Sequence, residues 1–297
     1  MMLRIGIDLG GTKTEGILID AAGTVLRRVR RPTPSARGYE AILDNVAALV
    51  AELEAAAGAP CRIGIGTPGA ISSRTGRLKN SNTTCLNGQP LKEDLEARLG
   101  RPVRLANDAN CFALSEARDG AARGAPVVFG VILGTGVGGG IVVHGRLIEG
   151  RQHIAGEWGH NVLEPDGPPC YCGKRGCVET FLSGPGLVRD WDAAAAGAAT
   201  AADVVARANA GDASAQAALA RYLERFGRAL AVVVNILDPD VVVLGGGLSN
   251  IDALYTHGRE RLAAHVFNDE LRTAVVRNRH GDSSGVRGAA ELWAPGE

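Results

Sequence analysis

One histidine and three cysteines lie close together in a glycine-rich stretch of this 297-residue chain. They are His160, Cys170, Cys172 and Cys177. Zinc prefers a tetrahedral set of sulfur and nitrogen ligands, and Gly173 and Gly176 would let the chain wrap around one ion. Four protein ligands leave no open position for water, so the pattern predicts a structural zinc site. A cluster of free thiols or a redox pair is the competing interpretation.

Two carboxylates flank this cluster. Glu157 lies three positions before His160, and Glu179 lies two positions after Cys177. A zinc knot would hold both carboxylates, which could then accept hydrogen bonds from sugar hydroxyls, joined by the second ring nitrogen of His160. The alternative is that both glutamates are solvated at the surface.

A further carboxylate follows a predicted strand. The segment that starts at Val103 is expected to deliver Asn107 and Asp108 to the beginning of a helix over residues 109–122. Asp108 could act as a general base that takes a proton from a sugar hydroxyl during phosphoryl transfer, while Asn107 holds the same substrate without adding charge. The competing interpretation is a helix N-cap.

Glycine turns follow four short apolar runs, over residues 5–9, 63–66, 127–133 and 241–244. The turns at Gly10–Lys13 and Gly134–Gly136 could bind phosphate oxygens through bare backbone N–H groups, or could be ordinary hairpin turns. Residues 134–139 match the letters of the dinucleotide fingerprint, but that fingerprint requires a helix after the turn, and a strand is predicted here. The first turn ends like a P-loop but lacks its first glycine, and a strand is again predicted after it. Asp8, just before the first turn, is expected to engage Mg²⁺, with a turn-capping role as the alternative.

The elements that would position these residues alternate between strands and helices. Helical periodicity covers residues 39–57, 109–122, 213–237 and 252–266, and the alanine-rich stretch 191–210 is expected to be surface helix with a loop. This alternation indicates an α/β protein. Shifting the sequence by 124 positions places Gly6 on Gly130 and Gly10 on Gly134, so we expect two similar halves with a boundary near residues 120–126.

Composition narrows the class of protein. The chain has 32 Lys and Arg against 32 Asp and Glu, and this balance indicates neither a nucleic-acid nor a membrane partner. Without a signal-peptide pattern or a long uncharged apolar run, a cytoplasmic protein is expected.

Several motifs together resemble the ROK family of repressors, open reading frames and sugar kinases. They are Asp8-Leu-Gly-Gly-Thr-Lys13, Gly66-Thr-Pro-Gly69, Asn107-Asp-Ala-Asn110, Leu133-Gly-Thr-Gly-Val-Gly-Gly-Gly140, Gly156-Glu-Trp-Gly-His160, Cys170-Tyr-Cys-Gly-Lys-Arg-Gly-Cys-Val-Glu179 and Leu244-Gly-Gly-Gly-Leu-Ser249. The resemblance implies a two-domain, actin-like ATPase fold of the hexokinase and ribonuclease-H type. It implies a small α/β domain over residues 1–122, joined by a terminal helix at about 285–297, and a large α/β domain over 123–284 with the zinc motif.

The resemblance also implies a role for each site residue. Asp108 would be the catalytic base. Sugar would be bound by Gly69, Asn82, Asn107, Asp108, Glu157, His160 and Glu179. ATP with Mg²⁺ would be bound by Asp8, Gly10, Gly11, Thr12, Lys13, Thr135, Gly136, Gly246 and Gly247. Zinc would be bound by His160, Cys170, Cys172 and Cys177. A homodimer is implied, and DNA binding is not expected, because no room precedes Asp8 for the winged-helix domain of the family's repressors.

Within the kinases, four stretches look closest to the bacterial fructokinase (manno-fructokinase) branch. They cover residues 105–111, 180–184, 235–240 and 280–289. We therefore expect fructose to be converted to fructose 6-phosphate, with N-acetylglucosamine, N-acetylmannosamine and glucose as alternative substrates. A sugar-binding sensor without activity and an acyl phosphotransferase are the alternatives from other classes.

Overall fold

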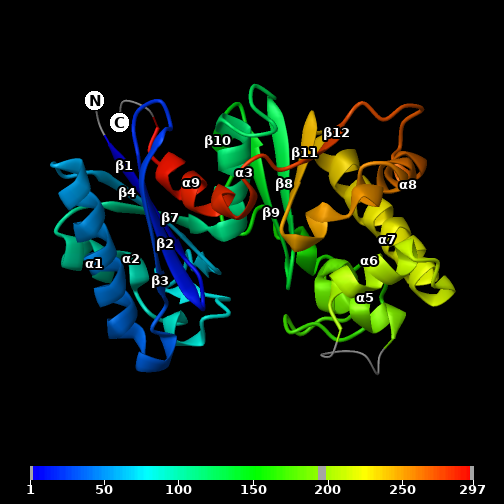
Figure 1. Cartoon of the computed structure of the whole chain (residues 1–297), viewed down its shortest axis with the longest axis horizontal. Helices are drawn as coiled ribbons and strands as arrows, with labels where there is room; N and C mark the ends of the chain where they lie inside the picture. Colours follow the sequence, from blue (N-terminus) through cyan, green and yellow to red (C-terminus); the bar gives the residue numbers. More distant parts are fainter. Residues whose placement is uncertain (1–2, 193–198, 295–297) are drawn as a thin grey trace.

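Two five-stranded sheets organise the computed structural model, which describes residues 3–192 and 199–294 (Figure 1). The first sheet has the order β3-β2-β1-β4-β7. Its strands are β1 (Arg4–Leu9), β2 (Lys13–Ile19), β3 (Val25–Pro32), β4 (Arg62–Thr67) and β7 (Val103–Asn107). The second sheet has the order β10-β9-β8-β11-β12. Its strands are β8 (Val127–Leu133), β9 (Val137–Val143), β10 (Arg146–Leu147), β11 (Val241–Gly245) and β12 (Ala274–Arg277). A small ribbon of β5 (Ala70–Ile71) and β6 (Leu78–Lys79) follows β4.

The two sheets repeat one topology. In each, the first three strands in sequence pair antiparallel and the last two lie parallel to the first. The shift of 124 positions aligns the two opening hairpins, with one difference in register. Leu9 pairs with Thr14 in the first hairpin, whereas Leu133 pairs with Val137 in the second. The second turn is therefore one residue tighter, and the predicted similarity of the halves is seen in the strand order.

Helices cover the outer faces of both sheets. On the first sheet they are α1 (Tyr39–Ala57) and α2 (Leu91–Leu99). In the second half they are α4 (Val178–Leu182), α5 (Gly184–Trp191), α6 (Ala201–Asn209), α7 (Ala213–Leu237) and α8 (His257–His265). Helix α1 ends at Gly58, whose left-handed conformation, with φ of 68°, closes the last turn.

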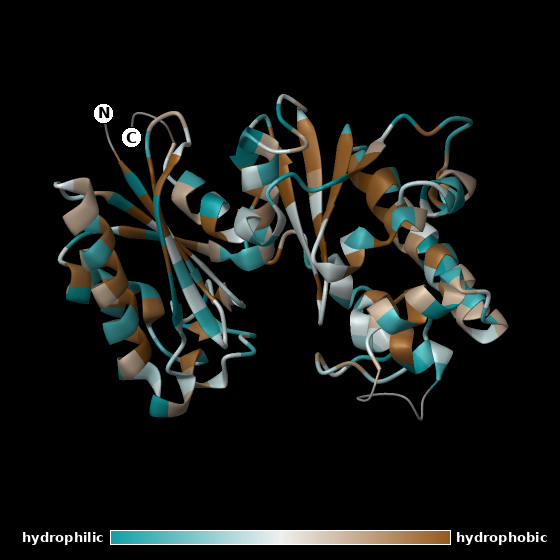
Figure 2. Ribbon diagram, in the orientation of Figure 1, coloured by the Kyte–Doolittle hydropathy of each residue, from teal (hydrophilic) through white to brown (hydrophobic). Residues whose placement is uncertain are grey.

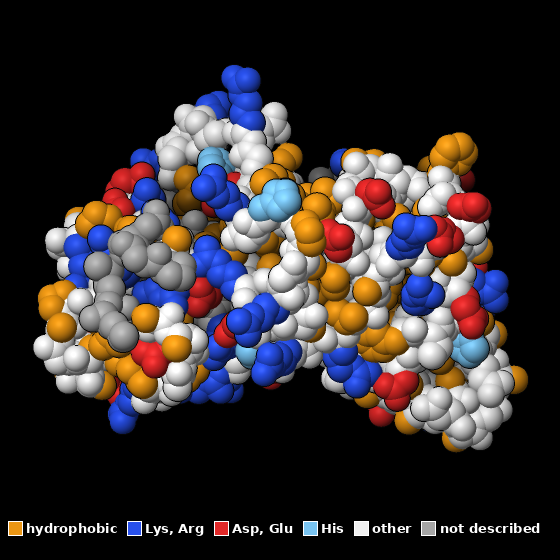
Figure 3. All heavy atoms as spheres, turned by 90° about the horizontal axis from the view of Figure 1, so that it is seen from above, with side chains coloured by type: hydrophobic (Ala, Val, Ile, Leu, Met, Phe, Trp, Pro, Cys, Tyr) orange, Lys and Arg blue, Asp and Glu red, His pale blue; other side chains and the backbone are white. Residues whose placement is uncertain are grey.

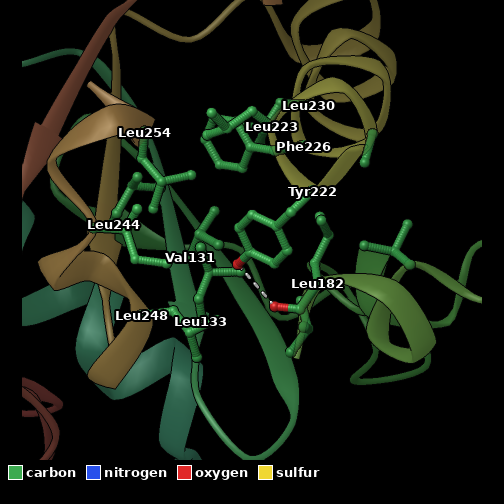
Figure 4. Close-up of a cluster of buried hydrophobic side chains, with 14 of the residues drawn as sticks. Val131, Leu133, Leu182, Tyr222, Leu223, Phe226, Leu230, Leu244, Leu248 and Leu254 are labelled. Carbon is green, nitrogen blue, oxygen red and sulfur yellow. Dashed lines mark hydrogen bonds between the residues drawn. The ribbon is translucent and has the colours of Figure 1, made fainter. Parts of the chain in front are cut away.

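The core of the second half lies between its sheet and α7. The strands of this sheet are coloured predominantly as hydrophobic in Figure 2. Tyr222 and Phe226 of α7 point toward Val131 and Leu244 of the sheet (Figure 4). The Tyr222 hydroxyl donates to the Leu182 carbonyl oxygen over 3.0 Å, so its buried polar atom has a partner.

Two helices fill the space between the sheets: α3 (Asp108–Arg118) and α9 (Ser284–Glu291) (Figure 1). Glycines in the facing strands allow their close approach. A Cβ at Gly6 of β1 would lie 2.1 Å from the Val286 carbonyl oxygen of α9. A Cβ at Gly130 of β8 would lie 2.6 Å from the Cβ of Ala113 in α3. The helix expected after Gly285 thus packs on the first sheet, and the division of the chain near residue 122 stays a prediction.

Local patterns predicted most elements well. The helices over 39–57 and 213–237 have the expected ends, and residues 252–266 form a short 3₁₀ turn followed by α8. Within the alanine-rich stretch, α6 is present, and residues 193–198 lie outside the described part. No helix in that part is both long and apolar enough to cross a membrane. Basic, acidic and hydrophobic side chains are interspersed on the face seen in Figure 3.

Candidate active site

The carboxyl ends of three parallel strands bring together the expected residues of the first sheet. Asp8 of β1 lies in register with Gly66 of β4, and Asn107 of β7 lies in register with Thr67. Beyond β4, the Asn107 side-chain amide donates to the Gly69 carbonyl oxygen over 3.2 Å. Crevices at this edge are common ligand sites in α/β proteins.

Asp108 is the first residue of α3, and the cap of that helix is its neighbour. The side chain of Asn107 accepts from the Ala109 backbone N–H over 2.8 Å at the N-cap position. The Asp108 carboxylate accepts from the same N–H over 2.8 Å. Burial raises the pKa of Asp108 to about 6, the Ala109 N–H opposes this, and the Glu157 carboxylate adds to it. Asp108 is therefore ionised at neutral pH, is not needed as the N-cap, and shares its surroundings with Glu157.

Asp8, near the end of β1, is a second carboxylate with a raised pKa. Burial, followed by the charges of Asp108 and Glu15, raises the pKa of Asp8 to about 6. Lys13 and Arg30 act in the opposite direction. A divalent cation would relieve the repulsion between these carboxylates, and oxygen donors of this kind suit Mg²⁺.

Three carbonyl oxygens of the first glycine turn accept hydrogen bonds from the chain that follows β3. Those of Gly10 and Gly11 accept from the hydroxyls of Thr33 and Ser35 over 2.7 and 3.3 Å, and the Thr12 carbonyl oxygen accepts from the Thr33 backbone N–H over 3.0 Å. These bonds keep the carbonyl oxygens of the turn occupied by the chain after β3, which favours an anion on the opposite side.

A second feature links this turn to the expected sugar residues. A Cβ at Gly11 would lie 3.1 Å from the Thr83 hydroxyl and 3.9 Å from the side-chain oxygen of Asn82. Asn82 therefore lies beside the first turn, whereas Gly69 and Asn107 meet at the ends of β4 and β7. Thr12 and Lys13 are exposed at the tip of the hairpin.

A cavity of about 890 Å³ opens beside the second turn. Its lining includes Gly134, Thr135, Gly184, Val205, Gly247 and Leu248. Gly246 does not line it but packs on the sheet, since a Cβ there would lie 2.3 Å from the Leu133 carbonyl oxygen. The cavity joins backbone of the second turn to apolar side chains of α6 and of the segment after β11, an arrangement that suits a flat, partly apolar group such as a nucleobase.

A second cavity, of about 860 Å³, runs along α3 and includes Gly69, Asn107, Asn110, Glu149 and His153 in its lining. It begins at the expected sugar residues of the first sheet and ends near Arg118. The two cavities thus lie next to different sets of expected residues, one beside the second glycine turn and the other beside β4 and β7.

The predicted zinc ligands meet in space. Ligand atoms of His160, Cys170, Cys172 and Cys177 all lie within 4.8 Å of one another. The Cys172 and Cys177 sulfurs are 3.6 Å apart, so they are not joined by a disulfide. This set of one nitrogen and three sulfurs fits structural zinc. The second ring nitrogen of His160, Nε2, lies 3.0 Å from the Tyr171 hydroxyl, a contact that sequence reasoning missed.

Glu179 connects the cluster to the second glycine turn. Its carboxylate accepts from the Val137 backbone N–H over 3.0 Å and would lie 2.7 Å from a Cβ at Gly136. The expected sugar residue is thus also a support of the expected phosphate turn. Glu157 immediately precedes the 3₁₀ turn Trp158–His160, and its negative charge contributes to the raised pKa of Asp108.

The glycines of β9 have a role that their sequence pattern did not suggest. A Cβ at Gly138 or Gly140 would meet Ala109 in α3, at 3.0 Å from its Cβ and 2.8 Å from its carbonyl oxygen. On the other face, a Cβ at Gly139 would lie 2.7 Å from the Gly156 carbonyl oxygen and 2.7 Å from the Trp158 ring. The helix that carries Asp108 and the loop that carries Glu157 and His160 therefore pack on opposite faces of β9. Only the backbone of this strand lies between them.

Comparison with known proteins agrees with this geometry. The ROK family model matches residues 4–295. The N-acetyl-D-glucosamine kinase of Escherichia fergusonii is 42% identical over 297 residues, covering 97% of this chain and 98% of that protein. The ROK hexokinase of Thermus thermophilus is 34% identical with a TM-score of 0.88, covering 97% of both chains. A ROK family glucokinase from Streptomyces griseus, solved with glucose and AMPPNP, is 30% identical with a TM-score of 0.80, covering 99% of this chain and 100% of that one.

These structural matches confirm the expected two-domain α/β fold of the actin-like ATPase type. The histidine and cysteine cluster lies where the sequence predicts a structural zinc site. By the match along nearly its whole length, this chain belongs to the ROK family.

Proposed function

We propose that the chain is an ATP-dependent sugar kinase that phosphorylates the primary hydroxyl of a hexose. The observation that carries this is a pair of acidic side chains at the carboxyl ends of the first sheet, Asp8 near the end of β1 and Asp108 directly after β7, together with the two glycine hairpins. One carboxylate suits a cation beside phosphates, and the other suits a base beside an alcohol. The family and the kinases among its members support the same activity.

In this mechanism Asp108 takes the hydroxyl proton of the sugar as its oxygen attacks the terminal phosphorus of ATP. The turns at Gly10–Lys13 and Gly134–Gly136 position the phosphates through their backbone N–H groups. Mg²⁺, held near Asp8, would supply charge neutralisation of the triphosphate. The cavity beside Thr135 and Gly247 would take the nucleoside, and closure of the two halves would exclude water, the competing acceptor.

For the sugar, N-acetyl-D-glucosamine is the substrate that the relatives favour. Enzymes named for this sugar are 42% identical to the chain over 97% of its length. The expectation of fructose has no support among these relatives. Fructose stays the second candidate, because the stretches 105–111, 180–184, 235–240 and 280–289 look closest to the fructokinase branch. The homodimer that the resemblance implies also stays a prediction.

The decisive experiment is ADP formation from ATP and Mg²⁺ with N-acetylglucosamine, fructose, mannose, glucose and N-acetylmannosamine, each tested against no sugar. We expect sugar-dependent ADP release with the highest kcat/KM for N-acetylglucosamine. A higher kcat/KM for fructose would transfer the proposal to the fructokinase branch. No sugar-dependent ADP release, with measurable sugar binding, would identify a sensor and refute the kinase. Formation of an acyl phosphate from a carboxylic acid would identify an acyl phosphotransferase.

A further inference from the structure

The cavity of about 860 Å³ along α3 has no role in the proposed reaction. We call it the α3 cavity. Gly69 and Asn107 line its near end, but Asp108, Glu157 and His160 are not part of its lining. Its walls come from both halves of the chain, since residues of β7 and of β10 line it on either side of α3 (Figure 1). Its volume is within the range of small-molecule sites.

One face of α3 forms part of the wall of the α3 cavity. Asn110, Leu114 and Arg118 follow one another at intervals of four residues, so they lie on the same side of the helix, and all three line the cavity. Asn110 is only 8% exposed, and its side-chain oxygen has no hydrogen-bond partner among the described residues. A buried amide oxygen normally has a donor. A hydroxyl group of a ligand would supply it.

Basic side chains outnumber acidic ones around the α3 cavity. The basic ones are Lys92, Arg104, Arg118 and Arg146, and the acidic ones are Glu93 and Glu149.

The chain holds two of these guanidinium groups in place. Arg104 donates to the Leu292 carbonyl oxygen over 2.7 Å, and Arg118 donates to the Glu291 carboxylate over 2.9 Å. Glu291 also pairs with Arg4, so one carboxylate is shared by two guanidinium groups and leaves a positive charge at this end of the cavity. Guanidinium groups fixed in this way are suited to bind phosphate.

Apolar side chains line the space between these polar groups. They include Ile71, Leu78, Leu105 and Leu147. Arg118 lies about 12 Å beyond Asn110 along the helix axis, so an isolated phosphate ion would not contact both side chains. A ligand that contacts both needs hydroxyl groups at one end, an anionic group at the other and a C–H surface between them. A phosphorylated sugar has all three.

We propose that the α3 cavity is a regulatory site that binds a phosphorylated sugar, the class of compound that the proposed reaction forms. Asn110 accepts the proton of a sugar hydroxyl, and Arg118 and Arg146 bind the phosphate. Because β7 and β10 belong to different halves, a ligand between them favours their present spacing and opposes closure. The inference goes beyond the proposed function and rests on it for the source of the ligand and for closure.

Calorimetry tests the site while the catalytic crevice is filled. N-acetylglucosamine 6-phosphate, and separately fructose 6-phosphate, is titrated into enzyme saturated with the corresponding sugar and a nonhydrolysable ATP analogue. We expect one binding event, about tenfold weaker in Asn110→Ala and in Arg146→Gln, as for loss of one hydrogen bond. Inorganic phosphate should bind at least tenfold more weakly than the sugar phosphate. Arg272→Gln, which removes an exposed guanidinium group outside the cavity, is the control and should bind as wild type.

Turnover separates regulation from ordinary product inhibition. In wild type, the sugar phosphate should lower kcat even at saturating sugar and ATP. R146Q, which alters an exposed side chain, should melt as wild type, keep the wild-type kcat without product and lose this inhibition.

Four results would each overturn the inference. They are no binding with the crevice filled, equal affinity in wild type, N110A and R146Q, equally tight binding of inorganic phosphate, and inhibition that saturating sugar and ATP abolish. The calorimetric test does not depend on turnover. If wild type shows no sugar-dependent ADP release, the proposed function fails, and the titration still decides whether the α3 cavity binds a phosphorylated sugar.

Discussion

At the scale of single residues, the two acidic side chains of the site differ from ordinary surface carboxylates in their proton affinity. The pKa of Asp108 and that of Asp8 are both raised to about 6, chiefly by burial. A base with this pKa is ionised at pH 7 and still accepts a proton more readily than an exposed aspartate. The same burial that tunes Asp108 makes its charge unfavourable for the folded state, so function and stability are in opposition here.

Replacement of Asp108 by Asn should therefore separate chemistry from binding. We expect kcat to fall by about 10²–10⁴-fold, the usual effect of a lost general base, while the sugar Kd measured by calorimetry stays near that of wild type. In wild type, kcat/KM should decline as the pH falls below about 6, because Asp108 becomes protonated. Turnover in D108N similar to that of wild type would refute the assignment of the base.

The stability of D108N carries a second prediction. The pKa of Asp108 rises from 3.8 to about 6 on folding, so the folded state binds this proton more tightly than the unfolded chain. The associated stabilisation is complete below pH 4 and is lost as the pH rises through about 6. D108N, which removes the charge, should raise the free energy of unfolding in urea by about 1–3 kcal/mol at pH 8 and by less at pH 5. An equal effect at both pH values would show that the carboxyl is not buried as described.

At the scale of elements, strand β9 helps to position the site because its glycines have no side chains. Its glycines bring α3 and the loop at Gly156–His160 to opposite sides of one backbone. Gly139→Ala should place a methyl group 2.7 Å from the Gly156 carbonyl oxygen and displace the loop that carries Glu157. We expect a loss of about 1–3 kcal/mol in stability and a raised sugar KM. Gly134→Ala is the contrast, since nothing lies within 4 Å of a Cβ there, and it should keep wild-type stability. Equal stability of the two variants would contradict this role.

The zinc cluster is the second positioning element. Because its ligands lie in the sequence between Glu157 and Glu179, loss of the ion should loosen both the expected sugar loop and the hydrogen bond from the Val137 N–H to Glu179. Purified wild type should contain about one zinc per chain by metal analysis. Cys172→Ser should lose the metal and melt at a lower temperature, whereas Cys85→Ser, outside the cluster, should keep it. A metal-free wild type with three reactive thiols and an unchanged melting temperature would exclude a structural zinc.

Sequence could predict the parts of this site that depend on local patterns. Glycine turns, apolar periodicity and the spacing of His160 with the cysteines located both hairpins, α1, α7 and the cluster. The rest depends on contacts between distant segments. Nothing near Glu179 indicates that it would bond to Val137, and nothing near Gly139 indicates that it would face Trp158. Residues 280–289 were noted in the sequence only for their likeness to fructokinases. Their structural role, a hydrogen bond from the His280 N–H to Glu116, depends on the fold of the whole chain.

At the scale of the whole molecule, the chain crosses between the two halves after α3 and again between β12 and α9. The crossings are tied together by Glu116, which is fully buried in α3. Its carboxylate accepts from the backbone N–H groups of Ala121, Arg279 and His280 over 2.8–3.1 Å. It also accepts from the Ser284 hydroxyl over 2.8 Å. A buried carboxylate with four donors holds the two connecting segments together at one place. Such a place suits a hinge about which the two halves could close.

Glu116→Gln should release this point. The side-chain NH₂ group of the glutamine would replace one of the two accepting oxygens of Glu116. At least one buried donor would then lack a partner, and each such donor costs about 1–3 kcal/mol. We expect the single urea transition of wild type to shift to lower urea and broaden in E116Q, as the two halves cease to unfold together. The sugar-induced compaction seen by small-angle scattering should also weaken. Glu260→Gln, at an exposed ion pair, is the control and should behave as wild type. An E116Q variant that unfolds in one transition as sharp as that of wild type, and that compacts fully with sugar, would show that the two crossings move independently of Glu116.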